Sequence, residues 1–398
     1  MRQIFINALL LTTLAIMTTA CTDNSAKDPT AKAMEQISEI LEKRYDIKDE
    51  IAPGAAVIIK KGDSILLEKY IGYADLFFKK PIDRLTHFNI ASCTKQFTAA
   101  AILKMQELGQ IDINKSIYEL SPEINKYLPP KKKPFTDITT ATLMAHSSGI
   151  PDARPREDKD FVLYATDMQS IEYIKNLDSL HFEPGTQYEY INPTFQLLYL
   201  FIEKLTGNNY EDYMENNIFK PSLMYTAKFF EPYRQIFHPS HGYIPDAQSY
   251  GGWKEYDYGE ESFFATKADG GLYITAREML HWLDALRDNV VLNEHSRSLM
   301  WRPTTQVSGS KFCDYQNRPN TFYGLGWFIE QQPNLPLKVY HTGDNGGFQA
   351  YEGYFPEADV AVVILENRND KPRWELVEQI DNILNQANLL APIKVTEN

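Results

Sequence analysis

Strand-like segments gather near the two ends of this chain, and a long, mostly helical stretch separates them. The first group covers residues 53–75, where two apolar runs broken at Lys61-Gly62-Asp63 predict a β-hairpin. The second group begins at Tyr323 and contains four segments, YGLGWFIEQ, LKVYHTG, GFQAYEGYFP and DVAVVILEN. Strands from both ends can share one sheet only if the chain returns to its start. The pattern therefore predicts an antiparallel sheet built from both chain ends, with a helical lobe beside it.

Helical patterns flank the strand groups on the outside. Apolar residues share one helical face near the start, at Met34, Ile37, Leu41 and Tyr45, and a closing helix is predicted for roughly residues 372–389. We therefore predict an α+β fold with an antiparallel sheet flanked by terminal helices. The predicted domain covers residues 31–390, with a sheet lobe from 31–85 and 300–390 and a mainly helical lobe at about 92–290. Sites in such proteins tend to lie between the lobes.

The first twenty residues carry the pattern of a secretory signal peptide. Arg2 precedes the apolar stretch IFINALLLTTLAIM, which is too short to span a membrane as a free-standing helix. The small residues before Cys21 resemble a bacterial lipoprotein cleavage site. We expect residues 1–20 to be removed, Cys21 to be lipidated, and residues 21–30 to form a polar tether. The protein would then reside in the cell envelope, periplasmic or on the surface; simple cleavage without a lipid is the alternative.

Charge and cysteine content exclude several classes of function. Loss of residues 1–20 removes one of the 40 Lys and Arg residues and none of the 53 Asp and Glu residues, so the net charge falls from −13 to −14. Such a surface repels phosphate backbones, which argues against nucleic-acid binding. Beyond Cys21 only Cys93 and Cys313 remain, a poor disulfide framework, and no histidines cluster at metal-ligand spacing. We expect no cofactor, no metal, and a small-molecule or peptide substrate.

A serine and a lysine three residues apart stand at the start of a predicted helix. Apolar residues recur at helical spacing from Phe97 to Leu108, Gly109 ends the run, and Ser92 and Lys95 are predicted to lie just inside the first turn of this helix. Positions i and i+3 of a helix are neighbours, so the amine can approach the hydroxyl and act as the base that a serine nucleophile needs. The first helical turn also has free backbone N–H groups and a positive dipole end, which stabilise an oxyanion. The pair therefore predicts a nucleophile and its base.

The same pair has a structural explanation when taken alone. Ser-x-x-Lys is a short pattern, and a helix N-cap followed by a solvated lysine satisfies it equally well. Ser308 and Lys311 repeat it in a stretch with no apolar helix behind it. A Tyr-x-Asn pattern at residues 190–192 is likewise repeated at residues 315–317. The surrounding sequence therefore has to decide between a catalytic and a structural role for the pair.

Five ordered segments supply that context. They are PGAAVIIKKGDSILLEKYIGYAD, FNIASCTKQFTAAAI, LMAHSSGIP, FEPGTQYEYINPTFQLL, and the combination of YGLGW with HTGDNGG. With them the chain resembles the serine β-lactamase and penicillin-binding-protein superfamily, and within it the class C β-lactamase-like branch. The resemblance covers nearly all of residues 31–390. Five landmarks in the order of that branch are far more specific than any one of them.

The resemblance implies a role for each matching residue. Ser92 corresponds to the acylated nucleophile and Lys95 to its amine partner. Tyr190 matches the phenolic proton-transfer group, and Asn192 matches the amide that orients the substrate. A tyrosine beside a lysine suits proton transfer because a nearby cation favours the phenolate; the alternative for Tyr190 is a core aromatic residue. The backbone N–H groups of Ser92 and Asp344 would form the oxyanion hole.

The chain departs from the branch at the substrate-binding strand. His341, Thr342 and Gly343 stand where the family usually has Lys-Thr-Gly, and we expect all three to contact the substrate. The usual lysine supplies a fixed charge for a substrate carboxylate, whereas a histidine is largely neutral near pH 7. Ile191 also replaces a small residue between Tyr190 and the following asparagine. We therefore expect weak binding of β-lactam and D-Ala-D-Ala carboxylates; family members with histidine here include esterase-like and D-aminopeptidase-like enzymes.

Two further features are not assigned to catalysis. His146 belongs to the landmark LMAHSSGIP, and we expect it to brace a loop rather than to react. An aromatic run is compatible with the mouth of a substrate site and equally with the packing of a hairpin; its members are Trp253, Tyr256, Tyr258, Phe263 and Phe264.

Three functional hypotheses follow from these residues. The leading one is an exported serine hydrolase that cleaves an ester, amide or peptide bond through an acyl-Ser92 intermediate. The first alternative is a true β-lactamase or D,D-peptidase. The second is a non-catalytic penicillin- or peptidoglycan-binding sensor, which the retention of the serine, lysine, tyrosine and asparagine disfavours because an inactive homologue usually loses one of them.

Overall fold

The computed structural model describes residues 28–45, 51–155, 157–158, 161, 165–231, 236–256, 266–310 and 320–393. Several features singled out in the sequence lie outside these ranges: the signal segment, Cys21 and most of the tether, Cys313, the second Tyr-x-Asn pattern, and Tyr258, Phe263 and Phe264. Among the residues that are described, no helix is long and apolar enough to cross a membrane.

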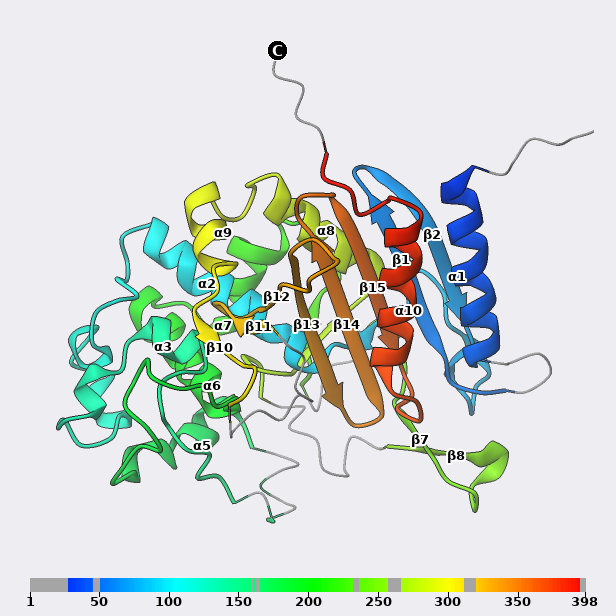
Figure 1. Cartoon of the computed structure of the whole chain (residues 1–398). Coiled ribbons are helices and arrows are strands. Elements are labelled where there is room, and N and C mark those ends of the chain that lie inside the picture. The colour runs from blue at the N-terminus through cyan, green and yellow to red at the C-terminus, as the bar shows by residue number, and fades with distance from the viewer. Residues whose placement is uncertain are drawn as a thin grey trace, which may run out of the picture.

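An eight-stranded antiparallel sheet dominates the right-hand side of Figure 1. Its strand order is β10-β11-β12-β13-β14-β15-β1-β2, so the N-terminal hairpin pairs with the last strand of the chain, and the two chain ends meet as the sequence predicted. The strands are β1 (Ala55–Lys61), β2 (Ser64–Ile71), β10 (Thr305–Gln306), β11 (Thr321–Tyr323), β12 (Phe328–Glu330), β13 (Lys338–Asn345), β14 (Phe348–Phe355) and β15 (Val360–Glu366).

The described residues also form three smaller sheets. The one nearest to Ser92 has the order β5-β9-β6, with β5 ending at Asn89. The short strands are β3 (Tyr73–Asp75), β4 (Lys80–Pro81), β5 (Phe88–Asn89), β6 (Lys228–Phe229), β7 (Tyr243–Pro245), β8 (Trp253–Glu255) and β9 (Leu272–Ile274).

The strands of the large sheet face two separate cores. In β1, Val57 and Ile59 pack with α1 (Pro29–Tyr45) and α10 (Arg373–Gln386), whereas Ala56 and Ile58 belong to the core shared with the helical lobe. Figure 1 shows α1 and α10 over one face of the sheet, with α8 (Ala276–Arg287) behind it. Because successive side chains point to opposite faces, a strand buried on both faces has an almost continuous apolar sequence.

The helical lobe surrounds α2 (Lys95–Glu107), whose residues from Lys95 to Leu103 are all buried. The helix is followed by Gly109 in a left-handed conformation, as the sequence predicted. Its start differs from the prediction, because Ser92 lies in a separate 3-10 turn and the α-helix begins at Lys95. Further α-helices among the described residues of the lobe are α3 (Thr140–Met144), α5 (Asp167–Ile171), α6 (Asn192–Thr206), α7 (Tyr210–Met214) and α9 (Glu294–Met300).

Candidate active site

Ser92 lies in the 3-10 turn Ala91–Thr94, here called the Ser92 turn, which leads directly into α2. Ala91 has a φ of +46°, a left-handed conformation that is strained for a non-glycine residue. The side chain of Asn89 offsets part of this strain, because its Oδ1 accepts a hydrogen bond from the Ala91 N–H at 2.9 Å. No described residue accepts a hydrogen bond from the Ser92 N–H, so this donor is available to a ligand.

Lys95 is buried beside the serine. Its Nζ lies 3.0 Å from Ser92 Oγ and 2.8 Å from the carbonyl oxygen of Asp269. No carboxylate among the described residues forms an ion pair with it. Burial therefore lowers the pKa of Lys95 to about 8, although the charge of Asp269 opposes the shift. A lysine with this pKa is partly neutral near physiological pH, and the neutral amine is the form that accepts a proton from serine.

Tyr190 and Asn192 lie where the chain enters α6. The ammonium group of Lys95 is 5.0 Å from the ring centroid of Tyr190 and 5.6 Å from that of Phe195, so it faces two aromatic rings. Asn192 is the first residue of α6, and its Oδ1 is buried with no hydrogen-bond partner among the described residues. The structure thus brings Ser92, Lys95 and Tyr190 together and provides a nearby amide that a substrate donor could reach.

His146 holds the backbone on both sides of Tyr190. Its carbonyl oxygen accepts a hydrogen bond from the Glu189 N–H at 2.9 Å, and its Nδ1 accepts one from the Ile191 N–H at 3.2 Å. The His146 ring centroid is 4.2 Å from that of Tyr190. Burial, helped by the nearby charge of Lys95, keeps the pKa of His146 well below its ordinary value. The ring is therefore neutral, and its contacts are those of a bracing residue.

Strand β13 borders the Ser92 turn with one edge. In the described part of the chain, β12 pairs with β13 only as far as Tyr340, which leaves the rest of that edge open toward the turn. Gly343 is required there because a Cβ atom would lie 2.1 Å from the carbonyl oxygen of Ile90. This close approach holds the strand against the residues that precede Ser92.

The orientation of the Gly343 carbonyl places the next N–H group. Gly343 pairs with Ala350 of β14, and both carbonyl oxygens accept hydrogen bonds from one nitrogen of Arg373, at 3.0 and 2.6 Å. The two carbonyls therefore point toward each other between the strands. Because the peptide bond is trans, the N–H of Asp344 points the opposite way, toward the open edge and the Ser92 turn. This is the direction that an oxyanion hole with Ser92 requires.

His341 lies buried on β13 with both ring nitrogens bonded. Nδ1 is 2.7 Å from the carbonyl oxygen of Thr342, which can only accept, so Nδ1 carries the proton. Nε2 then accepts a hydrogen bond from the hydroxyl of Tyr323 at 2.8 Å. Burial and the charge of Lys95 lower the pKa of His341 to about 3. The ring is neutral and has no free nitrogen for a substrate; Thr342 points to the opposite face of the strand.

Three residues that the sequence did not single out complete the surroundings. Asp269 supplies a carbonyl to Lys95, Tyr323 bonds His341, and Arg373 holds Gly343 while also pairing with the carboxylate of Asp344. Tyr323 opens the landmark YGLGW, which was a signal that could have been used. Asp269 acts through its backbone, and Arg373 reaches Gly343 from the start of α10, far along the chain, so neither has a local sequence pattern.

Other groups of interest contribute little to this site. Among the residues that the structure describes, no three His, Cys, Asp or Glu side chains are grouped to hold a metal ion. From the aromatic run, Trp253 lies 4.4 Å from the guanidinium of Arg368, and the N–H of Tyr256 bonds the carbonyl of Gly242. For these two residues the structure favours packing of the β7–β8 hairpin.

Comparison with known proteins adds a family and a fold. A family model described as Beta-lactamase matches residues 37–384 of the chain. Protein flp of Staphylococcus aureus (strain NCTC 8325 / PS 47) is 27% identical over 357 residues, which cover 88% of this chain and 66% of that protein. The chain therefore spans slightly less than two thirds of the length of this relative.

Solved structures share the architecture at low identity. The octameric penicillin-binding protein homologue from Pyrococcus abyssi has a TM-score of 0.73 at 24% identity, with 91% of this chain and 77% of that chain covered. D-amino acid amidase from Ochrobactrum anthropi SV3, complexed with L-phenylalanine, has a TM-score of 0.70 at 21% identity, with 89% and 99% covered. At these identities the similarity shows a common fold, and the chemistry has to be argued from the site.

Proposed function

The chain belongs to the β-lactamase family, and from this premise we propose that it is an exported serine hydrolase that cleaves an ester, amide or peptide bond through an acyl-Ser92 intermediate. The observation that carries the proposal is the 3.0 Å contact between Ser92 Oγ and Lys95 Nζ, made by a buried lysine whose pKa is lowered to about 8. A solvated surface lysine would be almost fully protonated at neutral pH and could not take the proton of the serine.

The first half of the proposed reaction forms the acyl-enzyme. Ser92 Oγ bonds to the substrate carbonyl carbon while its proton passes to the neutral amine of Lys95. The electron pair of the C=O bond moves onto oxygen, where the N–H groups of Ser92 and Asp344 stabilise the charge. The carbonyl then re-forms, the bond to the leaving group breaks, and that group takes a proton through Lys95 or Tyr190 and departs as an alcohol or amine.

The second half returns the enzyme to its starting state. A water molecule adds to the acyl carbon as one of its protons passes to Tyr190 or Lys95. Collapse of this second oxyanion breaks the ester bond to Ser92, and Oγ regains its proton. The products are a carboxylic acid and the alcohol or amine, so one water is consumed per bond cleaved. The 5.0 Å separation between the Lys95 ammonium and the Tyr190 ring supports the sharing of this proton-transfer work.

We further propose that the preferred substrates carry no carboxylate beside the scissile bond. His341 is neutral, and both its nitrogens are occupied. Two other buried cations near Lys95 and β13 are also engaged, Arg154 with Asp152 and Arg373 with Asp344 and two carbonyls. None of these three groups offers a free fixed charge to a substrate carboxylate. The similarity in fold to a D-amino acid amidase is compatible with an uncharged amide.

Initial rates on a panel of substrates test the proposal. The panel contains p-nitrophenyl acetate, D-phenylalaninamide and nitrocefin, each measured with wild type and with Ser92→Ala. We expect the ester or the amide to have a higher kcat/KM than nitrocefin, and Ser92→Ala to be inactive on all three. Nitrocefin as the best substrate would favour the β-lactamase alternative. A single covalent event without turnover would favour the sensor.

Export and anchoring form a separate proposal, which the N-terminal sequence pattern supports. We propose that the mature protein begins at a lipidated Cys21 and resides in the cell envelope. The native protein should then partition into detergent with a blocked N-terminus, and Cys21→Ala should be soluble or remain unprocessed. A native protein that is wholly soluble with a free N-terminus would contradict this.

A further inference from the structure

A buried arginine reaches the peptide that is proposed to bind the oxyanion. Arg373 is the first residue of α10, and its Nη1 donates to the carbonyl oxygens of Gly343 and Ala350 at 3.0 and 2.6 Å. Its Nη2 pairs with the carboxylate of Asp344. Arg373 is only 7% exposed, so these bonds form where most water is excluded. One side chain thus contacts both residues that share the Gly343–Asp344 peptide bond.

The two ends of that peptide unit are electrically coupled. Its C=O accepts a hydrogen bond from a guanidinium on the β14 side, and its N–H points to the Ser92 turn on the other side. A charged donor at the oxygen draws electron density from the amide, which makes the N–H a stronger donor, as in other chains of hydrogen bonds. The effect is larger where the local dielectric constant is low.

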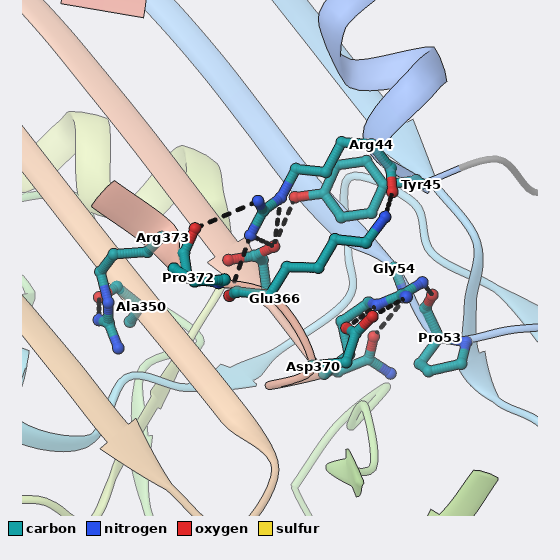
Figure 2. A network of polar contacts seen from close by, with 12 residues as sticks. Arg44, Tyr45, Pro53, Gly54, Ala350, Glu366, Asp370, Pro372 and Arg373 are labelled. Carbon is teal, nitrogen blue, oxygen red and sulfur yellow. Dashed lines mark hydrogen bonds and ion pairs between the residues drawn. The ribbon is translucent and has the colours of Figure 1, made fainter. Parts of the chain in front are cut away.

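A polar network fixes the segment from which Arg373 extends, as Figure 2 shows. Arg44, near the end of α1, bonds Glu366 Oε1 at 3.1 Å and the carbonyl oxygens of Lys371 and Pro372 at 3.3 Å. The hydroxyl of Tyr45 donates to the same Glu366 oxygen at 2.7 Å. These contacts tie the last residue of β15, and the last two residues of the connection between β15 and α10, to the end of α1. The start of α10, and with it Arg373, is therefore held in place.

We propose that Arg373 is a positioning residue for acyl transfer, which holds and polarises the Gly343–Asp344 peptide so that the Asp344 N–H stabilises the oxyanion more strongly. The inference rests on the proposed function, since it requires an oxyanion at Ser92. Nη1 and Nη2 of Arg373 are committed to protein acceptors. Its contribution therefore falls on the rate of bond formation rather than on substrate affinity.

Arg373→Ala tests the proposal in the full mature chain. We expect kcat for p-nitrophenyl acetate to fall about tenfold to a hundredfold, less than after loss of a whole oxyanion donor. KM should stay within about threefold of wild type, because ground-state contacts remain. Covalent labelling of Ser92 by a fluorophosphonate should slow by a similar factor, since that reaction also places negative charge on an oxygen in the same position.

A control variant separates the contact with the Gly343 carbonyl from a general loosening of the segment before α10. Arg368→Ala loosens that segment by losing the bond to the Pro53 carbonyl at 3.0 Å, and it leaves Arg373 in place. It should lose less than about threefold in kcat. A loss as large as in Arg373→Ala would overturn the proposal.

Other outcomes are equally decisive. A folded Arg373→Ala with kcat within about twofold of wild type contradicts the inference. If this variant does not fold, Arg373→Lys keeps the charge with fewer donors and should lower kcat at unchanged KM; an unchanged kcat again contradicts it. Ser92→Ala run in parallel separates the two levels: if it stays active the proposed function fails, whereas an inactive Ser92→Ala beside an unaffected Arg373 variant defeats only this inference.

Discussion

Two buried lysines on opposite sides of the large sheet have different surroundings. Lys338, at the start of β13, lies 2.7 Å from Asp381 and 3.0 Å from Glu330. Lys95, on the side of the helical lobe, contacts the Ser92 hydroxyl and a backbone carbonyl, with no carboxylate ion pair among the described residues. Their exposed fractions are 2% and 0%, so burial alone does not distinguish them.

The difference lies in the countercharge. Two carboxylates offset the cost of burying the ammonium of Lys338 and join β13 to β12 and to α10, so this lysine serves the fold. Lys95 lacks such partners, and its pKa is lowered to about 8 because its charged form is poorly compensated. A buried lysine that is easily deprotonated beside a hydroxyl is suited to proton transfer. The presence or absence of carboxylate partners, rather than the degree of burial, therefore determines whether a buried lysine is suited to stabilising the fold or to proton transfer.

The largest expected contrast between the two lysines is in turnover. Lys95→Met should lower kcat by about a thousandfold or more, because the nucleophile and its base act as one unit. Lys338→Met, the matched change, should leave the kcat of the folded protein within about tenfold of wild type, since it touches none of the reacting groups. Initial rates with p-nitrophenyl acetate on verified folded protein measure this. Equal losses of kcat in the two variants would show that the two lysines do not differ in their importance for turnover.

The free energy of unfolding should change in opposite directions in Lys338→Met and Lys95→Met. Lys338→Met leaves two buried carboxylates without their cation and should cost about 3–5 kcal/mol. The lowering of the Lys95 pKa from 10.5 to about 8 corresponds to a cost of about 3 kcal/mol for the charged form. Lys95→Met removes that cost, less the two hydrogen bonds it loses, and should stabilise the protein at neutral pH.

The change in the free energy of unfolding caused by Lys95→Met should depend on pH. Below about pH 8 the lysine is protonated in both the folded and the unfolded protein, so the full cost is present. Above that pH the folded protein releases the proton first, and the cost disappears as the pH approaches the ordinary lysine value. Urea unfolding at pH 7 and at pH 10 should therefore show a gain from Lys95→Met only at the lower pH. A loss of stability at pH 7 would show that Lys95 is compensated as Lys338 is.

The pH dependence of the rate distinguishes Lys95 from the nearby histidines as the titrating group. If neutral Lys95 is the base, kcat/KM for a neutral ester should fall about tenfold per pH unit below about pH 8. His341, with a pKa of about 3, and His146, with a pKa well below its ordinary value, should not titrate in the range studied. A rate profile from pH 5 to 10 gives the answer. An inflection near pH 6.5 would implicate a histidine instead.

The smallest predicted effect concerns His341, which replaces the lysine of the family's usual Lys-Thr-Gly motif. His341→Lys should raise kcat/KM for nitrocefin several-fold relative to p-nitrophenyl acetate, because a charge that meets a substrate carboxylate is worth about 1 kcal/mol. Tyr323→Phe is the matched control, since it removes the bond to His341 at 2.8 Å without adding charge. Efficient nitrocefin hydrolysis by wild type, with no gain in the lysine variant, would contradict this account of position 341.

Most of the large sheet could be predicted because its strands leave patterns in the sequence. The break at Lys61-Gly62-Asp63 marked the hairpin that the structure shows as β1 and β2, and the closing helix expected at about 372–389 is α10. The start of α2 was wrong because a 3-10 turn and an α-helix both bring residues i and i+3 together. The positive φ of Ala91 could not be predicted either, because alanine rarely adopts a left-handed conformation.

The candidate site was only partly visible in the sequence. Ser92, Lys95 and Tyr190 belong to short motifs, and the structure places them together, while their chemical roles stay predictions. Asp269 and Arg373 could not be foreseen, because one acts through a carbonyl and the other reaches Gly343 from 30 positions along the chain. The orientation of the Asp344 N–H likewise follows from strand pairing, which the residue types do not encode.

If a buried neutral lysine activates Ser92, the serine becomes acylated during turnover. Quenched-flow intact-mass spectrometry with p-nitrophenyl acetate near pH 8, followed by peptide mapping, detects such an intermediate. We predict that an acetyl adduct appears within the first turnover, maps to Ser92 and decays at the rate of product formation, and that it is absent from Ser92→Ala and Lys95→Met. Steady turnover with no adduct, or an adduct on another residue, would contradict the account.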